Sequence, residues 1–217
     1  MNSAELKSKA KEQIKGKIGI LFVITLIISG ISFAAFFLLA FIPGGSLIAS
    51  IIITPAMSLS IVRVYLMVIG GKEPESKDAF CGFDDFWSAF KVTFLVGLFT
   101  FLWSLLFIIP GIIKSISYSM SMYILAENKG KSAMECIEES KAMTDGRKLE
   151  LFDLALSFIG WYFVGMLTLG IGYIWIIPYV SATFANAYRS LNPLPVIEEV
   201  FENNGNEDDP FAHSKTA

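Results

Sequence analysis

The sequence predicts an all-α, polytopic membrane protein with six transmembrane helices, paired as three hairpins and accompanied by amphipathic interfacial helices. Three observations predict this class. First, 54% of the 217 residues are hydrophobic and only 17% are charged, whereas about 25% of the residues in soluble domains are charged. Second, the hydrophobic residues gather in runs of about 20, long enough to cross roughly 30 Å of hydrocarbon as a helix. Third, tight and long connections alternate between these runs.

Each hydrophobic run is expected to form one span. The six predicted spans cover residues 18–42, 47–69, 90–109, 111–127, 151–169 and 171–190. Tight turns containing Pro or Gly join the two spans of each hairpin, at 43–46, 110–111 and 170–172. Longer, charged connections join the hairpins to one another, at 70–89 and 128–150.

The spans belong to one membrane domain, residues 18–191, which is flanked by two polar regions. Residues 1–17 are predicted to form a basic amphipathic helix. Residues 192–217 are acidic and rich in Asn, a composition that buries little apolar surface. We therefore expect this tail to be largely disordered.

Lysine and arginine residues predict the orientation of the spans. They occur in the first 17 residues and in the two long connections, whereas the three tight turns contain none. Cytoplasmic loops of membrane proteins carry an excess of Lys and Arg. Both termini and the long connections are therefore predicted to be cytoplasmic, and Lys114 is exceptional because it lies at the outer end of a span.

The three hairpins resemble one another. The second span of each contains a proline near apolar β-branched residues, then small and hydroxyl residues, then a tyrosine; the prolines are Pro55, Pro110 and Pro178. A charged, partly amphipathic segment precedes each hairpin, at 3–17, 78–91 and 132–146. The last of these opens with a capping-box pattern, Ser132 to Glu135. Internal repeats are common in membrane folds, so a threefold repeat is predicted; the alternative is that membrane hairpins share this composition generally.

An aromatic face lies at the start of the second hairpin. Phe80, Phe83, Trp87 and Phe90 recur at steps of three and four residues, the spacing of one helix face. Aromatic side chains of this kind suit the headgroup boundary of a bilayer. These four residues are therefore candidate interfacial residues, and the alternative is a helix packed on the cytoplasmic base of the bundle.

The second, fourth and sixth spans hold most of the small and polar residues, which mark helix contacts in membranes. We expect these three spans to form the inner contacts of the domain. Helical spacing places Lys114, Ser117, Tyr118 and Ser121 on one face of the fourth span. Intramembrane charges are also functional candidates, although packing and snorkelling to the interface explain the same residues. The candidate ligand or lipid contacts are Arg63, Lys114, Ser117, Tyr118, Ser121, Asn186 and Arg189.

The sequence contains no strong catalytic or metal-binding motif. Its single histidine, His213, lies in the tail, and Cys81 and Cys136 have no histidine near them in the sequence. Patterns such as HExxH, a P-loop or CxxC are absent. We therefore expect no catalytic residue, no metal and no cofactor, and a protein that is not an enzyme. The basic residues serve topology and anionic lipid rather than nucleic acid.

Residues 115–191 carry a family resemblance. The runs SISYSMSMYILAEN, SAMECIEESKAMTDGRKLELFDLALSFIGW and LTLGIGYIWIIPYVSATFANAYRSL resemble a bacterial integral-membrane family catalogued as domain of unknown function 975. The basic N-terminal helix fits the same family, so the likeness covers most of residues 1–191. More distantly, that family resembles the membrane domain attached to some glycerophosphoryl diester phosphodiesterases, whose soluble catalytic part this chain lacks. The resemblance implies a multi-pass protein of the bacterial cytoplasmic membrane and carries over no catalytic residue.

Three functions fit these observations. The leading one is a non-enzymatic membrane protein that handles a lipid or small amphiphile, or has another role in the envelope. The alternatives are a transporter-like permease and a membrane scaffold that binds a cytoplasmic protein partner through its cytoplasmic helices or its tail. Membrane lipids are the expected partners in the first case, and the oligomeric state is open in all three.

Overall fold

The computed structural model of the protein describes residues 3–42, 45–168 and 172–192, with the side chains of residues 46–50 excepted. The secondary structure of these residues is helical, as predicted, and they include no strand. The helices are α1 (Ser3–Ile14), α2 (Ile18–Leu39), α3 (Gly45–Ile69), η1 (Ser76–Phe80), α4 (Phe86–Leu106), α5 (Ile108–Tyr118), α6 (Ser121–Glu127), α7 (Ala133–Thr144), α8 (Lys148–Leu156), α9 (Ile159–Leu167) and α10 (Tyr173–Leu191). Apart from Asn192, the predicted tail lies outside the described residues.

Two of the three predicted amphipathic segments form short helices that lead into the first helix of a predicted hairpin. α1 and α7 each have 12 residues, and each ends at a turn whose glycine has a positive φ, 84° at Gly16 and 72° at Gly146. Glycine adopts this left-handed conformation at little cost. The predicted capping box of α7 is confirmed, because Ser132 Oγ accepts a hydrogen bond from the Glu135 N–H while the Glu135 carboxylate accepts one from the Ser132 N–H.

The second connection differs from this pattern. The short 3₁₀ helix η1 ends at Phe80 and α4 begins at Phe86. Gly82, between them, lies so close to α3 that a Cβ atom there would overlap the carbonyl oxygen of Ala56. Its N–H donates to Ser60 Oγ at 2.9 Å. The prediction of an amphipathic helix across 78–91 is therefore wrong for residues 81–85, of which Cys81, Gly82 and Asp85 contact α3.

The second hairpin turns three residues earlier than predicted. Phe107 is extended, with φ −158° and ψ 146°, and α5 starts at the next residue. Pro110 fits the first turn of α5 because its missing N–H has no acceptor there. A Cβ atom at Gly111 would overlap the side chain of Ser104 on α4. Proline and glycine thus mark the start of α5 and its contact with α4, rather than the turn itself.

Two of the predicted spans are interrupted helices. The fourth consists of α5 and α6, and the fifth of α8 and α9. At the first interruption, the hydroxyl of Ser140 on α7 donates to the carbonyl oxygen of Ser117 at 2.8 Å and accepts from the N–H of Met120 at 3.2 Å. The Ser140 side chain thereby provides hydrogen-bond partners for a backbone carbonyl and a backbone N–H at the break.

Within the described residues, five helical segments are long and apolar enough to cross a membrane: Ile18–Leu39, Ile51–Ile69, Phe86–Leu106, Ile108–Glu127 and Lys148–Leu167. They correspond to the first five predicted spans. α10 takes the place of the sixth and has 19 residues, but polar residues such as Asn186 and Arg189 make it less apolar than those five segments. These helices are those of a multi-pass membrane protein.

The inner contacts involve α3, α6 and α10, so the prediction holds for the second and sixth predicted spans and for the α6 part of the fourth. α3 contacts both of the others, and 67% of its apolar segment is buried, against 17% for α2 and 11% for α4. Tyr123 of α6 stacks on Tyr188 of α10 with ring centroids 5.3 Å apart. Buried alanines such as Ala182 and Ala185 allow the close approach of α10 to its neighbours.

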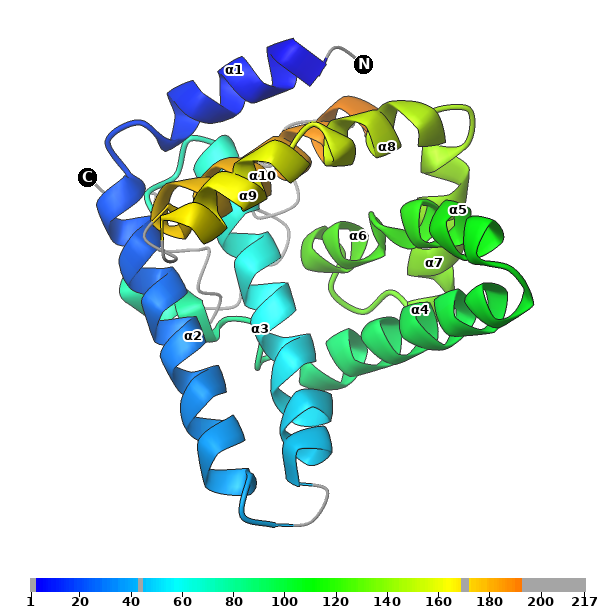
Figure 1. Ribbon diagram of the computed structural model, residues 1–217, viewed down its shortest axis with the longest axis horizontal. Coiled ribbons are helices and arrows are strands. Elements are labelled where there is room, and N and C mark those ends of the chain that lie inside the picture. The colour runs from blue at the N-terminus through cyan, green and yellow to red at the C-terminus, as the bar shows by residue number, and fades with distance from the viewer. Residues whose placement is uncertain (1–2, 43–44, 169–171, 193–217) are drawn as a thin grey trace.

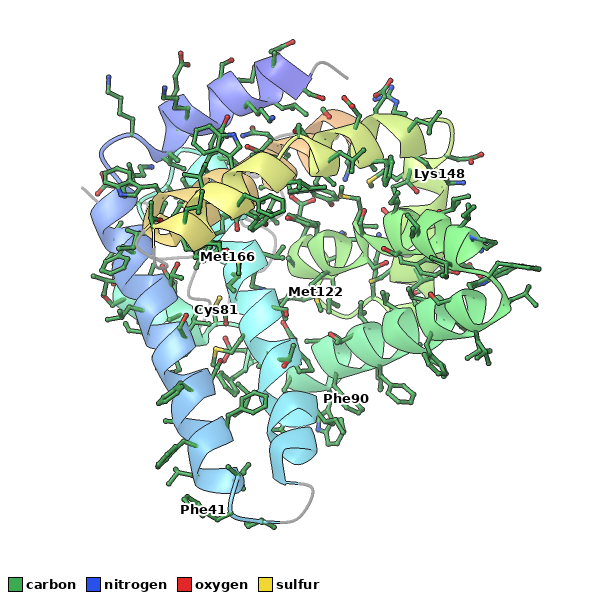
Figure 2. The ribbon with its side chains drawn as sticks, in the orientation of Figure 1. Phe41, Cys81, Phe90, Met122, Lys148 and Met166 are labelled. Atoms are coloured by element: carbon green, nitrogen blue, oxygen red, sulfur yellow. The ribbon has the colours of Figure 1, made fainter. Side chains whose placement is uncertain are left out.

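The helix pairs run in different directions (Figure 1). The α2–α3 pair runs down the view, α4 and α5 extend to the right, and α8 and α9 cross the top with α10 beside them. Figure 2 places Phe41 at the tip of the first pair, and Lys148 and Met166 at opposite ends of α8–α9. The pairs therefore meet around α3 and α10 rather than forming one parallel bundle.

Candidate functional site

Arg63 is a buried cation on α3 whose partners come from the connection before α4. Its exposed fraction is 1%. Nη1 donates to the carbonyl oxygen of Cys81 at 2.6 Å, and Nη2 forms an ion pair with Asp85. Cys81 lies beside α3 (Figure 2), and burial raises the pKa of its thiol to about 12. In this structure Arg63 therefore binds the connection between η1 and α4 to α3.

Lys114 lies against an aromatic ring of the neighbouring helix. Its Nζ is 4.7 Å from the centroid of the Trp103 ring, a cation–π contact. Lys114 is partly buried, and the contact joins α5 to α4 near the hairpin turn. Lys114, the lysine at the outer end of a predicted span, thus has a partner within its own hairpin.

The polar residues of the fourth predicted span are buried or exposed according to the helix face on which their spacing places them. Ser117, Tyr118 and Ser121 are buried, whereas Ser115 and Ser119 are exposed. The Ser117 hydroxyl donates to the carbonyl oxygen of Ile113 at 2.9 Å, within α5. Next to this face lies α7, whose Ser140 occupies the break.

The two polar candidates on α10 contact different helices. Asn186 Nδ2 donates to Gln13 Oε1 on α1 at 2.6 Å. Arg189 forms an ion pair with Glu127 at the end of α6. The hydroxyl of Tyr188 donates to the same carboxylate at 2.6 Å, so Glu127 joins α6 to α10 through two side chains.

The seven candidate contacts therefore do not converge on one site. Arg63, Lys114, Asn186 and Arg189 each meet a different neighbouring element, and the serines and Tyr118 lie in a separate contact near α7. Their contact with lipid or ligand stays a prediction.

The four candidate interfacial residues form two separate ring contacts. Phe80 and Phe83 have centroids 6.5 Å apart in the connection. Trp87 and Phe90 meet edge to face at 6.0 Å on α4. Phe80, Phe83 and Trp87 are exposed and Phe90 is half-buried, so the four side chains share a surface location without forming one helix face.

A groove of about 580 Å³ lies between the first two helices and α9 and α10. Its first side, from α1 and the start of α2, consists of Lys11, Glu12, Ile14, Lys15 and Ile18. Its second side, from α9 and α10, consists of Trp161, Trp175, Ile176 and Tyr179. One side thus carries charges and the other is aromatic and aliphatic.

The aromatic side of the groove is held by ring contacts. Trp161 meets Tyr179 edge to face, with centroids 6.1 Å apart. Tyr179 also meets Phe158 edge to face at 5.5 Å, and Phe158 is buried. Lys7 Nζ lies 4.5 Å from the Phe158 centroid on the side of α1. These contacts tie α1 to α9 and α10 and fix the position of the Trp161 and Tyr179 rings.

Sequence reasoning missed this groove. It counted Lys11 and Lys15 only as signals of orientation, and it placed Trp161 and Trp175 in separate spans. The available signal was the pair of lysines four residues apart, which share a helix face, together with two tryptophans, a residue type typical of membrane interfaces. Nothing in the sequence showed that α1 lies next to α9 and α10.

The arrangement offers binding surfaces rather than reactive groups. Among the described residues, no group of three or more His, Cys, Asp or Glu side chains could hold a metal ion. Both described cysteines are buried free thiols, and burial raises the pKa of Cys136 to about 11. A buried thiol of raised pKa is a poor nucleophile at neutral pH.

Comparison with known proteins gives a family but no close relative. Neither the curated proteins nor the solved structures contain a match to this chain, and the comparisons give no support for a likeness to the membrane domain of glycerophosphoryl diester phosphodiesterases. A family model described as "Protein of unknown function (DUF975)" matches residues 1–117 and 105–194. These matches cover most of the chain, including the groove and the inner contacts. The chain therefore belongs to the DUF975 family.

Proposed function

We propose that this protein is a non-enzymatic, multi-pass protein of the bacterial cytoplasmic membrane that binds a lipid or small amphiphile. The observation that carries the proposal is the groove between α1, the start of α2, α9 and α10. Ligand sites have volumes of about 300–1,000 Å³ and are mostly apolar with a few placed polar groups. The groove has a volume of about 580 Å³, and its lining is mostly apolar with three charged residues on one side.

The shape of the lining supports an amphiphile in particular. Lys11 and Lys15 supply cationic heads on flexible apolar stems, which lie along apolar surfaces while the charge stays in water. Trp161 and Trp175 supply large apolar rings with exposed fractions of 49% and 60%. A molecule with a polar head and an apolar tail would satisfy both sides of the groove at once.

A test compares lipid retention by the full chain and by Trp175→Ala, which removes one wall of the groove. Native mass spectrometry of the detergent-purified protein, after incubation with a phospholipid, measures the bound fraction. Loss of the indole surface is expected to weaken binding on the order of tenfold. Phe101→Ala is the matched control, because Phe101 is an exposed aromatic residue of α4 outside the groove. Equal retention by Trp175→Ala and the unmodified protein would contradict the proposal.

We further propose that the hairpins form a threefold repeat and that both termini are cytoplasmic. The equal lengths of α1 and α7 and their similar glycine turns support the repeat for the first and third units. A reporter fused after Gly45 is expected to show the activity of the outer side, whereas one fused after Lys129 should show cytoplasmic activity. The opposite pattern would overturn the topology.

A further inference from the structure

We infer that the groove selects an anionic phospholipid, whose phosphate lies between Lys11 and Lys15 while its acyl chain lies along Trp161, Trp175 and Ile176. This inference rests on the proposed function, because it names the class of amphiphile that the same groove takes.

The two lysines are placed to share one anion. They are four residues apart on α1 and its C-terminal turn, and residues at this spacing lie on the same helix face. Both side chains are exposed and both line the groove. Two ammonium groups on the same side of an apolar groove favour a phosphate, which can accept hydrogen bonds from both.

The other lysines of this region are already engaged. Lys9 pairs with Glu5 at 2.7 Å, and Lys7 lies over Phe158. Lys17 Nζ donates to the carbonyl oxygen of Lys72 at 2.9 Å. Within residues 3–42, 45–168 and 172–192, by contrast, neither Lys11 nor Lys15 forms an ion pair. These two cations are therefore the ones left to receive an external anion.

The net charge of the lining favours an anionic over a zwitterionic head. Lys11, Lys15 and Glu12 together give the groove one net positive charge. A lipid with a single uncompensated phosphate neutralises that charge. A choline head instead brings a cation of its own next to the two lysines, so part of its phosphate attraction is lost to repulsion.

The apolar side accounts for the lipid tail. Tyr179 packs between Phe158 and Trp161 through edge-to-face contacts, so the rings of this wall already support one another without a ligand. Trp161 and Trp175 leave about half of their surfaces open. Tryptophan and tyrosine suit the boundary where one end of a molecule is apolar and the other is hydrated. A water-soluble phosphate would leave these surfaces uncovered, so the inference commits to a lipid.

The test measures the preference of the full chain for palmitoyl-oleoyl phosphatidylglycerol over the phosphatidylcholine with the same acyl chains, by native mass spectrometry in detergent. The variant is Lys11→Gln/Lys15→Gln. Its control is Lys9→Gln/Lys141→Gln, which changes the net charge equally at two exposed lysines outside the groove. Each lysine near an anionic lipid contributes about fivefold to binding. We expect the groove variant to lose at least fivefold of the preference while it keeps phosphatidylcholine binding, and the control to keep the preference.

The outcomes separate this inference from the proposed function. Equal binding of the two lipids by the unmodified protein, or an unchanged preference in Lys11→Gln/Lys15→Gln, would overturn the inference and leave the groove as an amphiphile site. Loss of the preference in the control as well would overturn it, because long-range charge would then suffice. Full displacement of phosphatidylglycerol by an equal concentration of sn-glycerol 3-phosphate would also overturn it, because the acyl chains would then contribute nothing. A different result would contradict the proposed function, namely that Trp175→Ala binds both lipids as well as the unmodified protein does.

Discussion

At the scale of single residues, the two intramembrane charges singled out by the sequence have different surroundings. Lys114 stays partly exposed over Trp103, as its place at the end of a span allows. Arg63 is fully buried and depends on Asp85 and on the carbonyl oxygen of Cys81. The sequence identified both charges but not their partners, because Asp85 is 22 residues from Arg63 and lies beyond a connection whose path depends on Gly82.

The Arg63 contact leads to a prediction about stability. Arg63→Met removes the partner of a carboxylate that is 24% exposed, and breaking a buried ion pair from one side costs about 3–5 kcal/mol. Because Asp85 is partly solvated, we expect a smaller loss of about 2–3 kcal/mol in the free energy of unfolding. Titration of the detergent-solubilised protein with sodium dodecyl sulfate, followed by circular dichroism, measures this loss.

The double variant Arg63→Met/Asp85→Leu provides the control. Replacing both partners by apolar groups leaves no unpaired charge, and such replacements are often close to neutral. The double variant should therefore be more stable than Arg63→Met alone. A double variant that is as unstable as the sum of the two single variants would show that the ion pair is not what holds the connection on α3.

At the scale of elements, hydrophobic patterning predicted the existence of the long helices, whereas their ends and interruptions depended on contacts made elsewhere. The capping box of α7 was predictable because Ser132 and Glu135 are neighbours in sequence. The turn at Phe107 was not, because Pro and Gly are equally compatible with a turn and with the first turn of a helix. The break between α5 and α6 was hidden from sequence reasoning, since Ser140 that fills it lies 20 residues from Met120.

That break gives a prediction for α7. Ser140 is buried and bonds to backbone groups on both sides of the interruption. Ser140→Ala leaves the Met120 N–H without this acceptor, and an unsatisfied buried group costs about 1–3 kcal/mol. We expect an unfolding free energy lower by that amount and faster hydrogen exchange at the Met120 amide. Ser119→Ala is the control, because Ser119 is exposed and its hydroxyl bonds only within its own turn; an equal effect in both variants would argue against a specific role for α7.

At the scale of the whole molecule, the inner contacts of α3, α6 and α10 followed from the distribution of small and polar residues between the spans. The groove did not follow, because its lining comes from residues 11–18 and 161–179, and sequence patterns do not give the distance between helices that are far apart along the chain. The five apolar segments were predictable from hydropathy, whereas α10 is less apolar because it mainly contacts protein. Its buried polar residues, such as Asn186, are paired with other parts of the chain.

The hydrogen bond between Asn186 and Gln13 ties α1 to α10 beside the groove. α1 buries Leu6, Ala10 and Ile14, and Gln13 both accepts from Asn186 at 2.6 Å and donates to the carbonyl oxygen of Ile69 at 3.3 Å. Gln13→Leu and Asn186→Leu should each destabilise the protein by about 1–2 kcal/mol. In the double variant the losses should fall short of additivity by about 0.5–1.5 kcal/mol, since the shared hydrogen bond is lost only once.

The same variants connect stability to binding. If the hydrogen bond positions α1, then Gln13→Leu shifts Lys11 and Lys15 away from the aromatic side of the groove, and the preference for phosphatidylglycerol should fall while the protein remains folded. The combination of Asn186→Leu with Ser119→Ala is the control cycle, because these two residues share no partner and their effects should add. Strict additivity of Gln13→Leu and Asn186→Leu, or an unchanged lipid preference in Gln13→Leu, would mean that the apolar face of α1 alone holds this helix in place.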